Sequence, residues 1–353
     1  MIKIGKSKIG LKYPTYFIAD IAANHDGDLN RAKLLIKLAA NAGANAVKFQ
    51  HFQAETIVSD KGFKSLENNN SHQASWGDSV FETYRKAELP INWIEELRMH
   101  ADHFGVDFFT APYSLELIEK VAPFVSAFKV GSGDITWIES LEKMSKFNKP
   151  VLLATGASDM SDVIRAVESI YKFNKDIILM QCNTNYTASS ENINYLNLNV
   201  LTTYSNLFKN IDLGLSDHTE GHLSVLGAVA LGARTVEKHF TDDRSRKGPD
   251  HKFSLNPAMW EEMVQEVRTL EKALGDGVKR VEENEKNSKI VQQRSLYFGK
   301  DIEKGHILQT TDVVALRPLS KNGLKPYELR QIIGKQVNKN VKFHDPIHFE
   351  NFT

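Results

Sequence analysis

Short apolar runs recur along the chain, and longer stretches with apolar residues at helical spacing separate them. Such runs predict buried β-strands. The predicted strands are Thr15–Asp20, Ala46–Phe52, Asp107–Pro112, Ala127–Gly131, Pro150–Thr155, Ile177–Asn183, Asp212–Ser216 and Thr235–Phe240.

The intervening stretches have the spacing of amphipathic helices, and Gly43 after the first of them is a typical helix stop. They are Leu29–Ala42, Ile91–Phe104, Leu115–Val121, Trp137–Phe147, Met160–Phe173, Asn199–Phe208, Leu223–Ala233 and Ala258–Leu274. The alternation has a period of roughly 25–35 residues, as expected of βα units. It favours a (β/α)8 TIM barrel over its competitor, a doubly wound open sheet.

One connection interrupts this rhythm. Residues 53 to 89 contain the polar sequence SLENNNSHQASWGD and a short amphipathic piece. A connection of this length in a compact domain is typical of a lid or a substrate wall, although its composition also suits a surface excursion.

The pattern changes after residue 275. Residues 276–291 are charged and helix-prone, which suggests a linker, and residues 292–353 show short strands with turns expected at Lys304-Gly305 and His344-Asp345. We therefore predict a barrel domain over 1–275, a linker over 276–291 and a small second domain over 292–353. A core of about sixty residues is near the lower limit for independent stability.

Composition narrows the class of protein. The 353 residues carry 44 Lys+Arg and 44 Asp+Glu, so no basic face indicates nucleic acid binding. The single cysteine, Cys182, excludes an internal disulfide framework and fits a reducing compartment. The N-terminus has no signal pattern, and no apolar run approaches the ~20 residues of a membrane span. We expect a soluble, cytoplasmic protein.

Two histidines stand at the ends of consecutive predicted strands. His218 and His239 flank the helix Leu223–Ala233, and a right-handed βαβ crossover would bring both to the carboxyl end of neighbouring strands. This arrangement suits a divalent metal with open coordination positions. Alternatively, each histidine caps its strand with a hydrogen bond. Asp217 could orient a metal-bound histidine.

Two lysines lie inside apolar runs. Burying Lys48 and Lys129 is expensive unless each meets an anion. Because Gly-Ser-Gly follows at 131–133, with amides that can cradle an oxyanion, Lys129 is interpreted as a phosphate or carboxylate ligand. The alternative is a lysine paired with a neighbouring carboxylate inside the barrel.

Two carboxylates are placed for general acid/base chemistry or for binding a sugar hydroxyl, namely Asp20 and Asp134, although Asp134 could instead cap a helix. The loop around Asp250 is either a surface turn or a sugar-contacting loop. Other polar residues expected where strands leave the sheet are Gln50, Thr110, Ser132, Thr184, Tyr186, Ser216, Glu237 and Lys238.

Several of these segments together resemble the sialic acid synthase family, which also makes legionaminic and pseudaminic acids. The matching segments are ANHDGD, VKFQ, KVGSGD, TG at 155–156, GLSDH, EKHF, GPDHKFSLNP and RP at 317–318. The resemblance covers essentially the whole chain. From about residue 292 the sequence resembles the family's second domain, a small β-clip similar to type III antifreeze protein (SAF domain).

The resemblance implies condensation of phosphoenolpyruvate with the open-chain aldehyde of an N-acylated hexosamine, which releases phosphate. Mn²⁺ or Mg²⁺ would be bound by His218 and His239, with Asp20 and Asp134 as catalytic carboxylates. Phosphoenolpyruvate would be held by Lys48, Gln50, Thr110, Lys129, Ser132, Thr184 and Ser216, and the sugar by Tyr186 and Asp250. Arg317 would reach the sugar of a partner subunit, because members of the family form domain-swapped homodimers.

The chain departs from the family at several of these positions. The family usually has glutamate where Asp20 and Asp134 stand, and a side chain shorter by about 1 Å can reduce the rate about 100-fold if nothing compensates. Ala154 replaces a serine, Ala111-Pro112 replaces Thr-Pro, and Tyr186-Thr187 replaces Tyr-Pro. The segment SHQASWGD lacks a clear match at the family's sugar-recognition position. We interpret these changes as a different acceptor sugar.

Two alternatives stay open. The first is a phosphoenolpyruvate-dependent synthase or lyase acting on a phosphorylated sugar, with Arg244 and Arg246 as candidates for the second phosphate. The second is a non-catalytic carbohydrate-binding or scaffold barrel.

Overall fold

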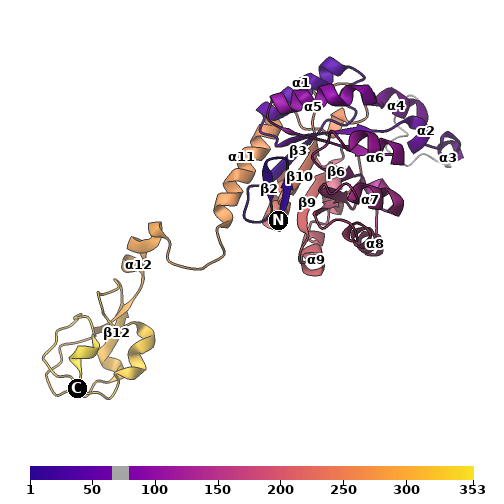
Figure 1. Cartoon of the computed structure of the whole chain (residues 1–353). Helices are drawn as coiled ribbons and strands as arrows, with labels where there is room; N and C mark the ends of the chain where they lie inside the picture. Colours follow the sequence, from indigo (N-terminus) through magenta and orange to yellow (C-terminus); the bar gives the residue numbers. More distant parts are fainter. Residues whose placement is uncertain (66–78) are drawn as a thin grey trace. The chain divides into compact units, whose positions relative to one another are not determined.

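The computed structural model describes residues 1–65 and 79–353. The chain divides into two compact units, Met1–Gly275 and Asp276–Thr353. Both are drawn in Figure 1.

The first unit is built on a closed parallel barrel. Its strand order is β10-β3-β4-β5-β6-β7-β8-β9, so each strand pairs with its neighbours in sequence and β10 closes on β3. The barrel prediction is confirmed, and the competing open sheet is wrong. The strands are β3 Tyr16–Asp20, β4 Ala46–His51, β5 Asp107–Pro112, β6 Phe128–Val130, β7 Val151–Ala154, β8 Ile177–Cys182, β9 Asp212–Asp217 and β10 Thr235–His239.

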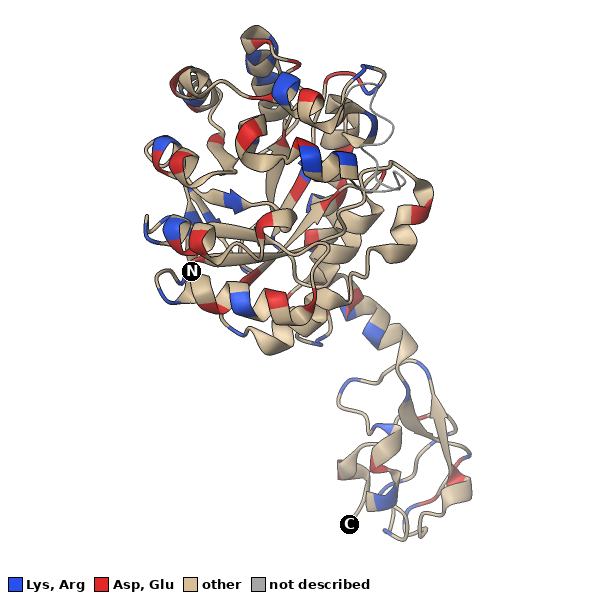
Figure 2. Ribbon diagram, turned by 90° about the vertical axis from the view of Figure 1, so that its right-hand side faces the viewer, with Lys and Arg blue, Asp and Glu red and all other residues tan. Residues whose placement is uncertain are grey.

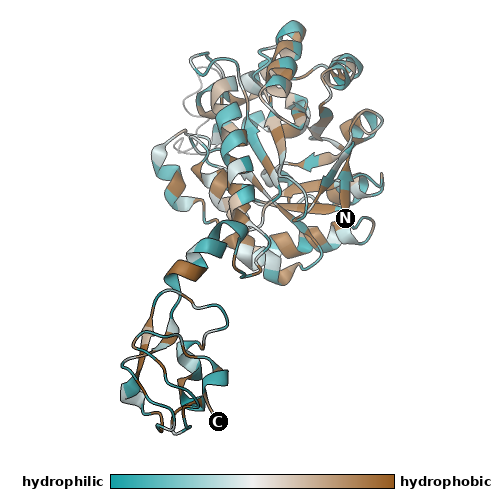
Figure 3. Ribbon diagram, turned by 90° about the vertical axis from the view of Figure 1, so that its left-hand side faces the viewer, coloured by the Kyte–Doolittle hydropathy of each residue, from teal (hydrophilic) through white to brown (hydrophobic). Residues whose placement is uncertain are grey.

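Helices surround this barrel (Figure 1). Charged residues of both signs are interspersed along them (Figure 2), and hydrophilic and hydrophobic segments alternate along their length (Figure 3), as expected of helices that bury one face against strands. The helices are α1 Leu29–Asn41, α5 Ile94–His103, α6 Leu115–Val121, α7 Ile138–Ser145, α8 Met160–Tyr171, α9 Val200–Leu207, α10 Leu223–Ala230 and α11 Pro257–Leu274, with 3-10 turns η2 Ile91–Trp93, η3 Ser132–Asp134, η4 Ser190–Tyr195 and η5 His251–Phe253.

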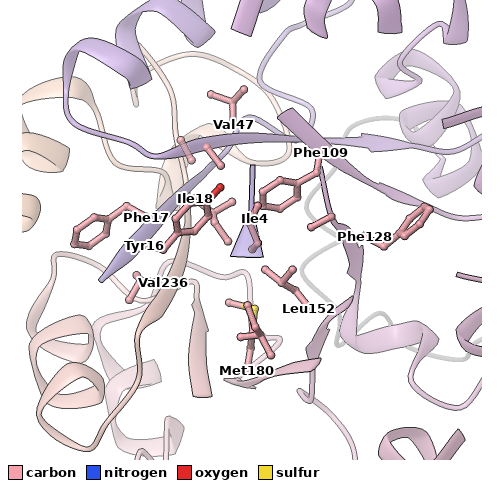
Figure 4. Packing of buried hydrophobic residues seen from close by; sticks show 14 of the residues in the cluster. Ile4, Tyr16, Phe17, Ile18, Val47, Phe109, Phe128, Leu152, Met180 and Val236 are labelled. Carbon is pink, nitrogen blue, oxygen red and sulfur yellow. The ribbon is translucent and has the colours of Figure 1, made fainter. Parts of the chain in front are cut away.

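Apolar side chains fill the lower part of the barrel. Ile18, Phe109 and Met180, from three different strands, meet there and are fully buried (Figure 4). Because successive residues of a strand face opposite sides of the sheet, these positions fix which residues further along each strand point inward.

An N-terminal hairpin closes the amino end of the barrel. It consists of β1 Ile2–Ile4 and antiparallel β2 Ser7–Ile9, and it inserts the fully buried Ile4 among the barrel side chains (Figure 4). Sequence analysis predicted no strand before Thr15, so it missed both strands of this hairpin. The sequence of β1 does alternate isoleucine with lysine, as a half-buried strand should. This alternation covers too few residues to be distinguished from a polar segment.

The long connection after β4 forms helices α2 Ala54–Ile57, α3 Asp60–Ser65 and α4 Val80–Ala87. The segment SHQASWGD, in which the sugar-recognition match is missing, lies at 71–78, outside the described residues.

The second unit has its own small core, and its two-stranded sheet is antiparallel. The expected turns are confirmed by positive φ angles at Gly305 (+95°) and His344 (+67°). Within the described part of the chain, no helix is long and apolar enough to cross a membrane. The elements of this unit are η6 Glu283–Glu285, α12 Lys286–Gln292, β11 Ser295–Phe298, η7 Thr310–Asp312, β12 Val313–Leu316, η8 Pro326–Gln331 and η9 Phe349–Asn351.

The hairpin generates a stability prediction at Gly5. Its φ is +53°, and a Cβ there would overlap the carboxylate of Asp107, so Gly5→Ala adds a steric clash to backbone strain. Gly105 has a similar φ of +72° with nothing within 4 Å of an added Cβ, so Gly105→Ala isolates the strain, about 1–2 kcal/mol. We expect Gly5→Ala to lower the melting temperature clearly more than Gly105→Ala. Equal effects would contradict the tight packing of the hairpin.

Candidate active site at the carboxyl end of the barrel

The two histidines meet at the carboxyl end of β9 and β10. The ring centroids of His218 and His239 are 5.3 Å apart, as the βαβ reasoning predicts. Nδ1 of His218 lies 2.9 Å from the carbonyl oxygen of Asn183. Because a carbonyl only accepts, this contact places the proton on Nδ1 and leaves Nε2 as a free donor of electrons to a metal.

Both imidazoles are neutral at ordinary pH. Burial, reinforced by their mutual repulsion in the case of His218 and by the ammonium of Lys48 in that of His239, lowers the pKa of each to about 3. Nδ1 of His239 is buried and has no hydrogen-bond partner among the described residues. Nδ1 of His239 and Nε2 of His218 fit a divalent cation with its other positions open. No group of three or more His, Cys, Asp or Glu residues in the described chain could hold a metal.

Directly below the histidines lies a buried cluster of two lysines and two carboxylates. Nζ of Lys48 lies 2.7 Å from Oδ2 of Asp20 and 3.2 Å from Oε1 of Glu237, and Nζ of Lys129 lies 3.4 Å from the same Glu237 oxygen. The lysines therefore have the carboxylate partners that the alternative interpretation required. Sequence reasoning noted Glu237 but missed its role, because neighbours across a barrel cannot be read from one strand.

Burial and charge act against each other in this cluster. Burial opposes ionisation of Glu237, yet the ammonium groups of Lys129 and Lys48 hold its pKa at about 2. Burial raises the pKa of Asp20 despite Lys48, and burial lowers the pKa of Lys129. Oε2 of Glu237 is buried without a partner among the described residues. An anion with several acceptor oxygens would relieve the partial pairing of Lys129.

Hydroxyl groups surround the cluster. Oγ of Ser216 donates to Glu237 at 3.2 Å, and Oγ of Ser132 accepts from the backbone N–H of Gly156 at 2.9 Å. A Cβ on Gly156 would meet Thr184, Ser132 and the thiol of Cys182, so these side chains converge on one spot. The position of Cys182 was missed because its sequence signal, a lone cysteine in a strand, is typical of a core residue.

Of the remaining predicted anion ligands, one lies in the site and one does not. Nε2 of Gln50 donates to Asp20 at 3.3 Å, inside the site. Thr110 instead contacts the carbonyl of Phe49 at 2.9 Å and Nδ1 of His51 at 2.8 Å. Because Phe109 points into the barrel, Thr110 points outward and Ala111 is the inward residue at this level. The structure therefore does not place Thr110 with the other anion ligands.

Asp217 does not orient a histidine, so that prediction is wrong. Its Oδ2 lies 2.5 Å from Nζ of Lys238, and it also accepts from Thr219 and Ser224. Ser216 points inward, so Asp217 faces the helices, where the alternation of β10 also places Lys238. This ion pair joins β9 to β10 directly behind the two histidines.

A cavity of about 180 Å³ opens above the cluster, between the barrel mouth and helices α2 and α4. Part of the long connection thus forms a wall of the site, as predicted. The lining residues are Ala23, Gln50, Phe52, Ile57, Thr83, Tyr84, Ala87, Tyr113, Tyr186, His239, Pro249 and Asp250.

Two acids belong to this region. Asp250 lines the cavity, its Oδ2 accepts from the N–H of Ala23 at 3.1 Å, and burial raises its pKa to about 7. Asp134 lies near Tyr113, and burial raises its pKa to about 6. Asp134 is not a helix cap, because α7 begins at Ile138. Tyr186 packs against His218, with ring centroids 4.3 Å apart.

An ion-pair network anchors the loop that carries Asp250. Arg31 binds both oxygens of Asp242, at 2.9 and 2.7 Å, and also pairs with Asp26 at 2.9 Å. Nε2 of the buried His251 lies 3.0 Å from Asp26. The network holds the loop after β10 against the loop after β3.

Two arginines that sequence analysis singled out, Arg244 and Arg246, pair with carboxylates outside this constellation. Arg246 pairs with Asp242 at 3.0 Å, and Arg244 pairs with Glu220 at 2.7 Å. Arg317 belongs to the second unit, where it is exposed directly after β12.

Comparison with known proteins identifies both units. The NeuB family model matches residues 35–279, and the SAF domain model matches residues 293–353. The chain is 36% identical to an N,N'-diacetyllegionaminic acid synthase of Campylobacter jejuni, over 93% of this chain and 97% of that protein. It is 33% identical to a human N-acetylneuraminate-9-phosphate synthase, over 96% and 93% of the two chains. The crystal structure of an N-acetylneuraminic acid synthetase from Leptospira borgpetersenii in complex with citrate superimposes with a TM-score of 0.71 at 30% identity, over 81% of this chain and 94% of that one.

Removing one partner of the ion pair behind the histidines should be costly. Lys238→Met leaves Asp217 charged, buried and short of its cation, which destabilises proteins by about 3–5 kcal/mol. We expect a large fall in the melting temperature. Lys120→Met, which removes an exposed pair with Glu116 on α6, should leave the melting temperature almost unchanged. Similar effects of the two changes would show that Asp217 is not dependent on Lys238.

The raised pKa of Asp250 makes stability depend on pH. An unfolded aspartate titrates near pH 4, so the folded chain holds this proton more tightly, and the resulting stabilisation is complete below about pH 4 and lost as the pH rises through about 7. Asp250→Asn is neutral at every pH. It should therefore melt a few degrees above the parent at about pH 8, and the gap should close towards about pH 4.

Asp242→Asn is the control of opposite sign. Although burial opposes its ionisation, Arg31 and Arg246 hold the pKa of Asp242 well below its ordinary value. Its contribution is present above the ordinary pKa and lost in acid, so this variant should melt below the parent at about pH 8 and approach it on acidification. Two variants whose melting temperatures differ from the parent in the same direction at about pH 8 would contradict the assignment.

Proposed function

This chain is an enzyme of the NeuB family, and we propose that it condenses phosphoenolpyruvate with the open-chain aldehyde of an N-acylated amino sugar, forming a nine-carbon 2-keto acid and phosphate. The observation that carries the proposal is the stacking of two layers in the barrel mouth. A pair of neutral histidines lies directly above a buried pair of lysines, and an open cavity adjoins His239.

The lower layer is the proposed phosphoenolpyruvate site. Lys48 and Lys129 would bind the anionic oxygens of phosphoenolpyruvate, and the hydroxyls of Ser132, Ser216 and Thr184 would lie beside these lysines. Lys129 pairs with Glu237 at a long distance of 3.4 Å and donates to the backbone carbonyl of Val130 at 3.2 Å, so its ammonium can turn to a phosphate or carboxylate without losing a close ion pair.

The upper layer is the proposed aldehyde site. His218 and His239 would bind Mn²⁺ or Mg²⁺, which when bound supplies Lewis-acid polarisation of a carbonyl oxygen and a site for water. C3 of the enolpyruvyl group attacks the aldehyde carbon, and the new hydroxyl takes a proton. Water then adds to C2, and phosphate leaves with its bridging oxygen.

The chain's carboxyl groups are placed for these proton transfers. Asp250 has a pKa near 7 and lines the cavity, so it is the proposed proton donor to the aldehyde oxygen. Asp20 bonds Lys48 and lies 3.5 Å from Nε2 of His239, between the two layers, so it is the proposed acceptor of the water proton. Asp134 would contact the sugar.

The second unit would complete the site from another subunit. We propose a homodimer with exchanged C-terminal domains, in which the exposed Arg317 of one chain reaches the sugar bound by the other. Its exposure directly after β12 is compatible with this role.

The test of the function is release of phosphate from phosphoenolpyruvate in the presence of N-acylated amino sugars, with mass detection of the product. Chelation of divalent ions should abolish turnover, and Mn²⁺ or Mg²⁺ should restore it. The function is wrong if purified protein supplied with either ion releases no phosphate with any N-acylated hexosamine or diamino hexose.

A matched pair of lysine variants tests the lower layer. Lys129→Met should raise KM for phosphoenolpyruvate at least about tenfold, because one charged hydrogen bond to the anion is lost. Lys149 is another sheltered lysine, but its ammonium donates to the carbonyls of Ala122 and Val125. Lys149→Met should leave KM unchanged. A rise in KM in both variants would point to a general loss of structure.

A further inference from the structure

Several hydroxyl groups line the cavity beside His239. Thr83 and Tyr84 contribute them from α4, and Tyr113 and Tyr186 contribute them from the segments that follow β5 and β8. Sequence analysis assigned a role to Tyr186 but none to Tyr113. Because hydroxyl groups bind ligands through directed hydrogen bonds, the position of each one decides which ligand fits.

Backbone and ring contacts fix the position of Tyr113. Since Phe109 points into the barrel (Figure 4), the two-residue period of the strand turns Ala111 and Tyr113 inward as well. The backbone N–H of Tyr113 donates to the carbonyl of His51 at 2.9 Å, and its ring packs against Phe52 with centroids 6.1 Å apart. The hydroxyl group is therefore carried to a defined place at the barrel mouth.

Gly131 makes room for this hydroxyl group. A Cβ at Gly131 would lie 2.7 Å from the hydroxyl oxygen of Tyr113 and 3.4 Å from the nearest ring carbons. The φ angle of Gly131 is −65°, which any residue adopts. The close approach of the tyrosine, and not the backbone conformation, therefore explains the glycine at this position.

The hydroxyl group of Tyr113 lies near the carboxyl group of Asp134 without being bonded to it. Burial, together with the charge of Asp134, raises the pKa of Tyr113 well above its ordinary value, so the hydroxyl keeps its proton and is a donor. Within residues 1–65 and 79–353, neither this hydroxyl nor the carboxyl of Asp134 has a hydrogen-bond partner, although sheltered polar groups usually have one. A donor and an acceptor are thus both available at one edge of the cavity.

Such a pair suits a hydroxyl group of a ligand, because a hydroxyl can accept one hydrogen bond and donate another at the same time. Resting on the proposed function, we propose that Tyr113 is a specificity-determining residue of the acceptor site, and that it binds one sugar hydroxyl together with Asp134. Tyr113 lines the cavity and Asp134 does not, so the tyrosine supplies the part of this contact that reaches furthest towards the ligand.

Tyr113→Phe tests the proposal because it removes the hydroxyl and keeps the ring. N-acetylmannosamine and a diacetamido hexose are supplied in turn with Mn²⁺, and KM for whichever sugar releases phosphate should rise about tenfold, since one hydrogen bond to the ligand is lost. KM for phosphoenolpyruvate should change less than about twofold, because its proposed site is the lower layer. Tyr171→Phe, in a half-buried tyrosine of α8 outside the cavity, should change neither constant.

Gly131→Ala displaces the same hydroxyl without removing it. It should raise KM for the acceptor in the parent chain, but it should add little in a Tyr113→Phe chain, where the closest contact is gone. Gly227→Ala is the matched control, because a Cβ there would also lie 2.7 Å from a side chain, that of Leu198, away from the cavity. This control should leave KM for the acceptor unchanged in both chains. Additive effects of Gly131→Ala and Tyr113→Phe would contradict the proposed role of the hydroxyl.

Single-deoxy forms of the accepted sugar identify the hydroxyl that is bound. At one position, removal of the sugar hydroxyl should lower kcat/KM of the parent about tenfold or more, because two sheltered protein groups are left unpaired. The Tyr113→Phe chain should lose much less at that position and as much as the parent at every other. The ratio is independent of the fraction of folded protein, because both sugars are measured on the same chain.

The outcomes separate the inference from the function. An unchanged KM for the acceptor in Tyr113→Phe, an equal rise in KM for both substrates, or equal losses with every deoxy sugar in both chains overturns the inference and leaves the condensation in place. Absence of phosphate release by the parent with every acceptor overturns the condensation, and the inference with it.

Discussion

Burial of opposite charges inside the barrel mouth is the constraint on which the site depends. Lys48 and Lys129 are almost inaccessible to water, and each would be destabilising alone. Asp20 and Glu237 offset these charges, but they share the two ammonium groups unequally. Lys48 pairs with both carboxylates, whereas Lys129 has one long ion pair, with Glu237, and a hydrogen bond to the backbone carbonyl of Val130. The cluster is thus balanced in charge yet incompletely paired, and an incoming anion would meet a preformed cationic position.

The two-residue period of strands decides which side chains take part. On β10, Glu237 and His239 point inward and Lys238 points outward, and on β9 the same alternation separates Ser216 and His218 from Asp217. From one sequence, the strands and their ends could be predicted, so the convergence of both histidines was foreseen. The register across neighbouring strands could not be predicted, which is why Thr110 and Asp217 were expected inside the site and the ion pairs of Glu237 with the two lysines were not foreseen.

Contacts made by loops were the least predictable part. The cavity wall comes from α2 and α4, in a connection whose sequence indicated only a lid or a surface excursion. The Arg31–Asp242 network joins residues that lie far apart in the chain, and no local sequence pattern predicts such a pairing. Ala111 and Ala154 occupy inward positions at the ends of β5 and β7, where the family resemblance implies hydroxyls. The differences from the family thus gather at the mouth, while the barrel below it follows the general pattern.

Because the hairpin closes the amino end of the barrel (Figure 4), ligands would reach the lysines from the carboxyl end, where the cavity lies in the described part of the chain. Lys48 lies one inward layer deeper than Gln50, and Glu237 one layer deeper than His239, so whatever binds to the lysines sits beneath whatever occupies the cavity. Under the proposed function, the anion at the lysines would bind before the ligand of the cavity and leave after it. Ordered binding of this kind would keep a reactive enol ester covered by its co-substrate before any bond is made.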